Sequence, residues 1–109
     1  MSGKTRVAVD AQIAALVPRF LANRAADVGR IRAALALGDF DTICAIAHAM
    51  RGAGGAYGFP EISRAGAAIE EGAQQRDAAL ISAPVSILEA YLARVEIKPA
   101  AGSGAAREG

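Results

Sequence analysis

Apolar residues recur at three- and four-residue steps through most of this 109-residue chain. This spacing places apolar side chains on one face of an α-helix and predicts amphipathic helices. Five stripes follow the rule: Ile13, Leu16, Val17, Phe20 and Leu21; Val28, Ile31, Leu35 and Leu37; Ile43, Ile46, Ala47 and Met50; Ile62, Ala65, Ile69 and Ala73; and Ile81, Val85, Leu88, Leu92 and Val95. We find no alternation of apolar and polar residues that would indicate a strand. The pattern therefore predicts five helical segments.

Capping residues mark the boundaries between these stripes. Asp10 is a candidate N-cap for the first helix. Gly38 suits the left-handed position after a helix, and Asp39 or Asp41 can cap the helix that follows. Pro60 fits the first turn of the fourth segment, because a proline there loses no helical hydrogen bond.

The last segment contains a proline whose role the sequence leaves open. Asp77 opens this segment, and Pro84 either kinks the helix or marks its true start, with Ser82 as the cap. The longer segments are expected to run antiparallel. The predicted fold is all-α: an antiparallel four-helix bundle with an additional N-terminal helix.

The length of the chain fits one domain with short ends. Residues 1–8 are polar and unpatterned, which predicts a flexible N-terminus. Residues 9–98 carry the helical pattern. Residues 99–109 are small and low in complexity, which predicts a disordered tail.

Composition excludes several classes of protein. The formal net charge is +1, without the clustered basic face of a nucleic-acid-binding protein. The single cysteine, Cys44, excludes an internal disulfide and fits a reducing compartment. No apolar run approaches the ~20 residues of a membrane-spanning helix, and no signal-peptide core is present. We therefore expect a cytoplasmic protein that binds neither nucleic acid nor membrane.

His48 is the only histidine, and its position on the third helix is informative. At 100° per residue, Ile46 and Met50 lie about 160° from it and Ile43 about 140°. The apolar stripe is therefore nearly opposite the histidine. This geometry predicts an exposed imidazole, which can act as a nucleophile.

The residues on the face around His48 have small side chains, apart from one cation. Cys44, Gly52 and Gly55 lie within about 40° of it and Arg51 about 60° away. Each glycine costs roughly 0.5–1 kcal/mol relative to alanine in a helix interior, so something other than stability keeps this space empty. Arg51 can hydrogen-bond an anion attached to the ring, and as a cation it disfavours the imidazolium.

Other residues near the motif have simpler interpretations. Gly54 lies about 120° from His48 toward the core, which predicts a role in close helix packing. Glu70 and Glu71 diverge by about 100° and are expected to be solvated. Cys44 and His48 are too few ligands for zinc, so no metal site is predicted.

The segment His48-Ala49-Met50-Arg51-Gly52, followed by Gly55 and Gly58, resembles the motif of the histidine-containing phosphotransfer (HPt) family. That family carries such a histidine on one helix of a four-helix bundle. The resemblance extends to Gly38-Asp39-Phe40 before the motif and to Ile69-Glu70-Glu71 and Gln75-Arg76-Asp77 after it, over about residues 9–97. Arginine at position 51, where lysine is more usual, keeps the charge and adds a fork for phosphate oxygens.

The resemblance implies a phosphorelay intermediate and not an enzyme. His48, through Nε2, would take a phosphoryl group from a receiver-domain aspartate and pass it to another, supported by Arg51. This chain would need no cofactor, because the receiver supplies the Mg²⁺, and no P-loop for ATP is visible. The implied partners are response-regulator receiver domains and a hybrid histidine kinase.

The surface that meets a receiver is expected to surround His48. Its candidates are Cys44, Ala45, Gly52, Gly55 and Arg64. The resemblance implies a monomer, because the four-helix version closes its own core. An alternative function is a helical adaptor that docks a receiver or histidine kinase without accepting phosphate.

Overall fold

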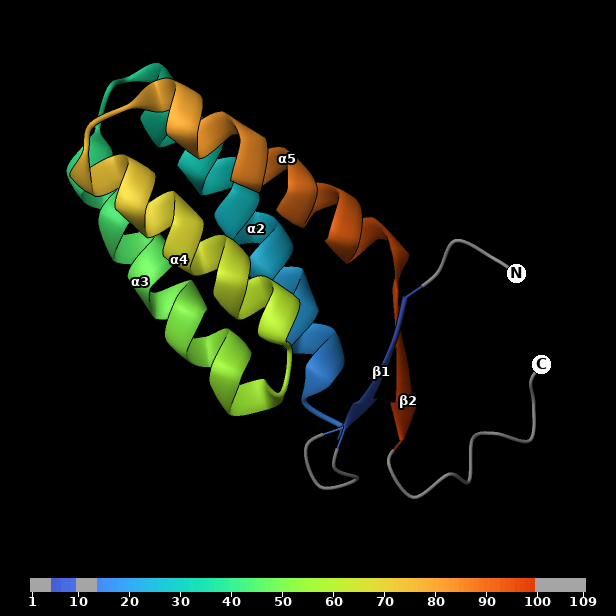
Figure 1. Cartoon of the computed structure of the whole chain (residues 1–109). Helices are drawn as coiled ribbons and strands as arrows, with labels where there is room; N and C mark the ends of the chain where they lie inside the picture. Colours follow the sequence, from blue (N-terminus) through green and yellow to red (C-terminus); the bar gives the residue numbers. More distant parts are fainter. Residues whose placement is uncertain (1–4, 10–13, 100–109) are drawn as a thin grey trace.

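A computed structural model describes residues 5–9 and 14–99, with side chains from residue 14 to residue 95. Within these residues the helices are α2 (Val17–Ala36), α3 (Phe40–Tyr57), α4 (Pro60–Gln74) and α5 (Ala78–Arg94). They lie side by side and successive helices run in opposite directions (Figure 1). The prediction of an all-α, antiparallel four-helix bundle is confirmed.

The first two predicted helices form one continuous helix, so the prediction of an additional N-terminal helix is not supported. The residues from 22 to 27 contain no glycine or proline that would end a helix, and α2 runs through them. Pro18 lies in the first turn of α2, where a proline marks a helix start. Leu37 lies at the C-cap and is 83% exposed, so it does not extend the stripe. The proposed cap Asp10 lies outside the described residues.

The turns between the helices use the predicted residues. Gly38 adopts a left-handed conformation (φ +70°), and the Asp39 side chain accepts a hydrogen bond from the Thr42 backbone N–H at 3.1 Å. Hydrogen bonds from the Thr42 hydroxyl and backbone hold the pKa of Asp39 below its usual range. Gly58, at φ +83°, ends α3, and the next helix begins at Pro60. Short turns of this kind keep α3 and α4 adjacent along their length.

Helix α5 begins at Ala78, well before Pro84. The Asp77 carboxylate caps it by accepting hydrogen bonds from the backbone N–H groups of Ala79 (2.9 Å) and Leu80 (3.2 Å). Pro84 therefore lies inside the helix, and Ser82 is not its cap. The Ser82 hydroxyl instead donates to the Ala78 carbonyl.

The core consists of the predicted stripes. The largest fully buried side chains are Phe59, Ile31, Ile43, Met50, Ile62, Ile69, Ile81, Leu88, Val17 and Val85. At one end of the bundle the ring of Phe20 stacks on Tyr57 and Phe59, with centroid distances of 4.4 and 5.4 Å. The rigid core fixes which faces of α3 and α4 remain at the surface.

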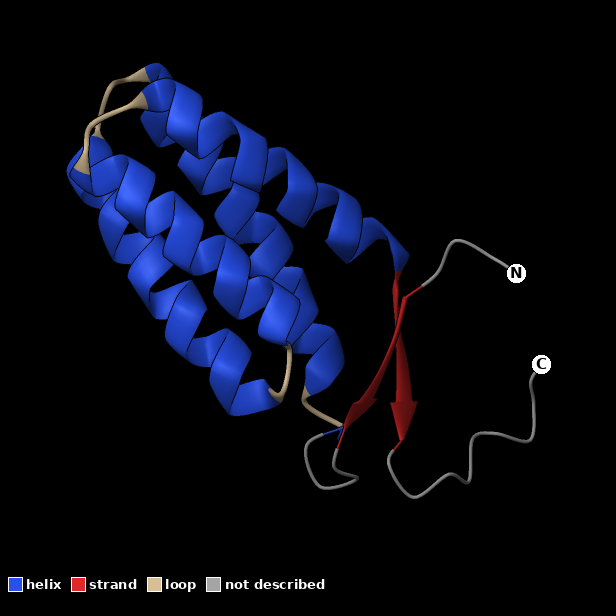
Figure 2. Cartoon of the chain, in the orientation of Figure 1, coloured by secondary structure: helices blue, strands red, loops and turns tan. Residues whose placement is uncertain are grey.

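The segment that precedes the helices and the segment that follows them pair as a two-stranded parallel ribbon (Figure 2). β1 (Thr5–Val9) pairs with β2 (Val95–Pro99), and Val7 lies opposite Ile97. The sequence interpretation missed both strands: it assigned residues 1–8 to a flexible segment, although Val7 and Val9 are β-branched residues at alternate positions. The strands meet because α2 begins and α5 ends at the same end of the bundle. The predicted tail beyond residue 99 lies outside the described residues.

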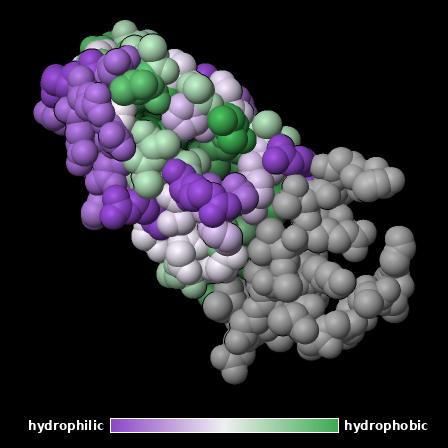
Figure 3. Space-filling model, viewed as in Figure 1, coloured by the Kyte–Doolittle hydropathy of each residue, from purple (hydrophilic) through white to green (hydrophobic). Residues whose placement is uncertain are grey.

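The surface seen from the side of α4 and α5 mixes hydrophilic and hydrophobic areas (Figure 3). Leu80 and Ile87 of α5 are 45% and 65% exposed. Among the described residues, no helix is long and apolar enough to cross a membrane.

Candidate functional site

His48 lies in the middle of α3 and points away from the core. Its side chain is 71% exposed, whereas Ile46 and Met50 are buried. The orientation predicted from the helical wheel is therefore correct. An incoming group can reach the imidazole from solvent.

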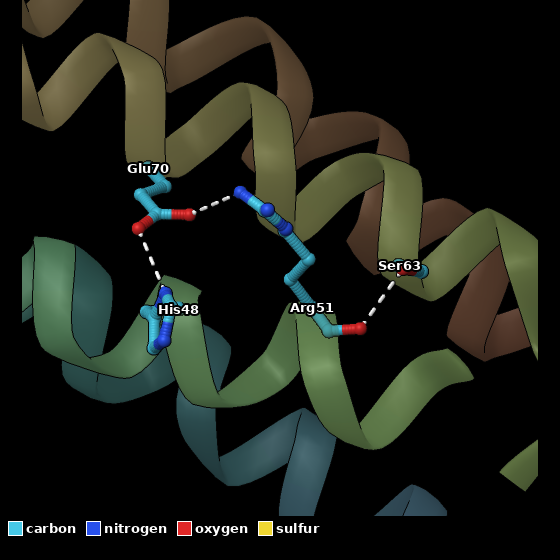
Figure 4. A network of polar contacts seen from close by, with 4 residues as sticks. All are labelled: His48, Arg51, Ser63 and Glu70. Atoms are coloured by element: carbon cyan, nitrogen blue, oxygen red, sulfur yellow. Dashed lines mark hydrogen bonds and ion pairs between the residues drawn. The ribbon is translucent and has the colours of Figure 1, made fainter. Parts of the chain in front are cut away.

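A carboxylate from the neighbouring helix holds one nitrogen of this ring. The His48 Nδ1 lies 2.9 Å from Oε2 of Glu70 on α4 (Figure 4). An ionised carboxylate can only accept a hydrogen bond, so Nδ1 carries the proton in this contact. In the neutral ring the lone pair is then on Nε2, which Glu70 leaves free. The contact thus selects the tautomer in which the outer nitrogen is the nucleophile.

The same carboxylate also holds Arg51. The Nη1 of Arg51 donates to Oε1 of Glu70 at 2.9 Å, so the carboxylate lies between the histidine and the guanidinium (Figure 4). The Arg51 side chain is 53% exposed, and a guanidinium has five N–H donors. Arg51 therefore keeps further N–H donors while it is bound to Glu70.

Glu70 corrects the sequence interpretation. It was expected to be solvated, but the residue is only 8% exposed. On the helical wheel it lies about 60° from Ala73, at the edge of the apolar stripe of α4. Because α3 covers that edge, a charged residue there needs partners on α3. The adjacent Glu71 is exposed, as expected.

A second buried carboxylate shows how different the setting of Glu70 is. Asp27 on α2 is 3% exposed and pairs with Arg24 at 2.8 Å and with Arg30, both on its own helix. Glu70 instead joins two helices and contacts a nucleophilic side chain. Only the arrangement at Glu70 orients a group that can react.

The glycines near His48 fall into two groups. A Cβ atom added to Gly52 or Gly55 would meet no atom within 4 Å. A Cβ on Gly54 would lie 2.6 Å from the backbone nitrogen of Ser63. The predicted packing role of Gly54 is consistent with this contact, whereas Gly52 and Gly55 leave open space on the His48 side.

A hollow lies on the Arg51 side of the histidine. Its volume is about 380 Å³, and its lining comprises Arg51, Gly54, Gly55, Gly58, Phe59, Pro60, Ser63, Arg64 and Ala67. The structure thus brings Arg51, Gly55 and Arg64 together around one surface feature. Arg64 is exposed there and pairs with Glu61 at 2.6 Å.

The other two predicted surface residues, Cys44 and Ala45, do not line this hollow. Cys44 is half-buried and Ala45 is exposed, and both precede His48 on α3 within one helical turn. Within the described residues, no group of three or more histidine, cysteine, aspartate and glutamate side chains is placed to hold a metal ion.

A four-helix bundle with an exposed histidine on one helix defines the class of signalling domain that the sequence motif resembles. The family model described as Hpt domain matches residues 15–97, and the chain belongs to this family. Domains of the family are phosphocarriers of two-component phosphorelays and interact with receiver and kinase proteins. Comparison with the curated proteins and with the solved structures gave no match.

Proposed function

We propose that the protein carries a phosphoryl group on Nε2 of His48 between the aspartates of receiver domains. The observation that carries this proposal is the bond between Nδ1 of His48 and Glu70 beneath a ring that is exposed to solvent. This contact supports Nε2 as the nucleophile. The open glycines beside the ring leave room for a second protein.

In the proposed reaction, the Nε2 lone pair attacks the phosphorus of an aspartyl phosphate. The bond between phosphorus and the aspartate oxygen breaks, and the receiver recovers its carboxylate. The proton on Nδ1 stays in its hydrogen bond to Glu70. Because the ring becomes cationic when Nε2 binds phosphorus, the buried carboxylate of Glu70 stabilises the product and the transition state that leads to it.

Arg51 has a separate role in this proposal. Its guanidinium is tethered to Glu70 by one N–H, and its other N–H groups can donate to the phosphoryl oxygens. Arg51 also offsets the charge of Glu70, so the carboxylate is not buried alone. We assign the Mg²⁺ of the reaction to the receiver partner, and this chain supplies the histidine and its electrostatic support.

We place the receiver on the surface formed by Gly52, Gly55 and the hollow beside Arg51. That surface combines open glycines with the exposed cations Arg51 and Arg64, which suit a partner whose reactive site is acidic. We further propose a hybrid histidine kinase as the source of phosphate and a monomeric carrier. An adaptor that docks these partners without accepting phosphate is the alternative.

The test is phosphotransfer from a panel of phosphorylated receiver domains to the wild-type protein and to His48→Gln. We expect label on the wild type only, in the acid-labile, base-stable bond of phosphohistidine. Glutamine removes the nucleophile but keeps a polar side chain at an exposed position, so the fold is retained. Label on both proteins would refute His48 as the acceptor. Binding of an active donor without any label would favour the adaptor.

A further inference from the structure

Two small residues of α4 contact the α3 backbone at the level of His48. Gly66 is buried against it, and the Ser63 hydroxyl donates to the carbonyl oxygen of Arg51 at 2.9 Å (Figure 4). Both contacts are with backbone atoms of the helix that carries the imidazole.

The contact at Gly66 is with backbone atoms. A Cβ at this position would lie 2.8 Å from the nitrogen of Arg51, 3.0 Å from its Cα and 2.9 Å from the carbonyl oxygen of Ala47. Ala47 and Arg51 lie on either side of His48 in the sequence. Backbone atoms of a packed helix cannot turn aside as a flexible side chain can, so a larger residue at position 66 would have to separate the two helices.

Such a separation would lengthen the hydrogen bonds that Glu70 makes with His48 and Arg51. Glu70 lies four residues after Gly66 and therefore on the same face of α4, one turn along. Its contacts with His48 and Arg51 both measure 2.9 Å, and an N–H···O bond weakens beyond about 3.2 Å. A change of a few tenths of an ångström in helix separation is thus enough to lengthen both bonds.

We propose that Gly66, with Ser63, is a positioning residue that sets the α3–α4 separation at which Glu70 keeps the proton of His48 on Nδ1. The inference rests on the proposed function, because it concerns the orientation of the same nucleophile. Its readout, however, is the state of the free protein and requires neither partner nor phosphate.

The test is ¹⁵N NMR of the His48 ring in the wild type and in Gly66→Ala, at about pH 8.5, where an ordinary histidine is neutral. Protonated and unprotonated ring nitrogens have distinct shifts. We expect a wild-type ring protonated on Nδ1 and, in Gly66→Ala, a shift toward a mixture of tautomers. With an active receiver, transfer by Gly66→Ala should be about tenfold to a hundredfold slower.

Gly72→Ala is the matched control. It lies on the same helix, and its Cβ would come within 3.0 Å of the Ile81 side chain and 3.1 Å of the Leu80 backbone, both on α5. It therefore perturbs packing as Gly66→Ala does, but against α5 and not against α3. We expect its tautomer to be that of the wild type. A wild-type tautomer in Gly66→Ala, or an equal shift in Gly72→Ala, would overturn the proposal.

Ser63→Ala keeps the proposal testable if Gly66→Ala does not fold. It removes one hydrogen bond without adding bulk, so we expect a folded protein with a smaller shift in the same direction. In that case an unchanged tautomer would refute the positioning role. The two proposals fail separately: the tautomer shift can occur in a protein that no receiver phosphorylates, and phosphorylation can occur with no tautomer shift.

Discussion

The two sides of α3 use glycine in opposite ways. On the side that faces α4, Gly54 of α3 and Gly66 of α4 allow backbone contacts that a single methyl group would block, with a Cβ at Gly54 only 2.6 Å from an atom of α4. On the side that carries His48, Cβ atoms at Gly52 and Gly55 would meet nothing within 4 Å. Packing explains the first pair and leaves the second unexplained.

This difference distinguishes glycines that packing within the protein requires from glycines that it does not require. Glycine in a helix interior costs about 0.5–1 kcal/mol relative to alanine. At Gly54 the close approach of α4 offsets that cost. At Gly52 and Gly55 no contact within the described residues does so. In the proposed function, the absence of side chains there gives a partner access to His48.

The largest expected effect comes from removing the charge of Glu70, where α4 packs against α3. Glu70→Gln replaces two anionic acceptors by one neutral oxygen, so the side chain can no longer hold both His48 and Arg51. Hydrogen bonds to charged groups contribute about 1.5–3 kcal/mol, so we expect phosphotransfer to His48 to slow by about tenfold to a hundredfold. Rapid-quench transfer from a phosphorylated receiver measures this rate.

Glu71→Gln is the control for that experiment. It makes the same chemical change at the next position, where the side chain is exposed and accepts a hydrogen bond from the Gln75 side chain at 3.2 Å. Transfer by this variant should equal that of the wild type. If Glu70→Gln were as fast as Glu71→Gln, the carboxylate would have no part in activating His48.

A smaller effect is expected from adding a side chain at Gly55, on the side of α3 that carries His48. Gly55→Leu adds a side chain where the structure has open space, so the free energy of unfolding should rise by about 0.5–1 kcal/mol through helix propensity. The same side chain would obstruct a docked receiver. We expect transfer to fall about tenfold although the protein is more stable. Urea unfolding and the transfer rate together measure both effects.

Gly29→Leu sharpens this result, because Gly29 lies in α2 and its Cβ would also meet nothing within 4 Å. It should give a similar gain in stability with wild-type transfer. Equal transfer by the two leucine variants would place the receiver surface away from Gly55, and the outer glycines would then lack a functional explanation.

Most of the bundle could be predicted from the sequence because its signals are local. Helical periodicity identified the core, and Asp39, Pro60 and Asp77 act at helix starts as their chemistry dictates. The ribbon was missed because its two short strands are separated in the sequence by all four helices. Thr5–Val9 alone is too brief a pattern to indicate a strand. The single helix α2 was not predicted, because two signals were not used: Pro18 in its first turn, and the lack of glycine and proline between residues 22 and 27.

The site was only half predictable. His48 and Arg51 follow from the wheel of one helix and the family motif. The role of Glu70 depends on how α4 packs against α3, which a single-helix pattern does not contain. The small residues Gly66 and Ser63 on the same face of α4 were the available signal, since they show where the neighbouring helix comes close.

The smallest expected effect tests whether the stability of α3 can be altered without altering either side of the site. Because the pKa of Asp39 is lowered in the folded protein, the unfolded chain binds its proton more readily. The stabilisation is therefore complete above the ordinary aspartate pKa of about 3.9 and is lost as the pH falls through the lower, folded value. Asp39→Asn keeps a good N-cap but cannot titrate.

We therefore expect the urea midpoint of the wild type to fall more steeply than that of Asp39→Asn between pH 5 and pH 2.5, values chosen to bracket about 3.9. At neutral pH, Asp39→Asn should transfer phosphate at the wild-type rate, since the cap lies about 13 Å along the helix axis from His48. Parallel pH profiles would show that the bonds from Thr42 do not stabilise the Asp39 carboxylate. Slower transfer at neutral pH would show that the start of α3 is coupled to the site, and that the contrast between its two sides does not account for reactivity alone.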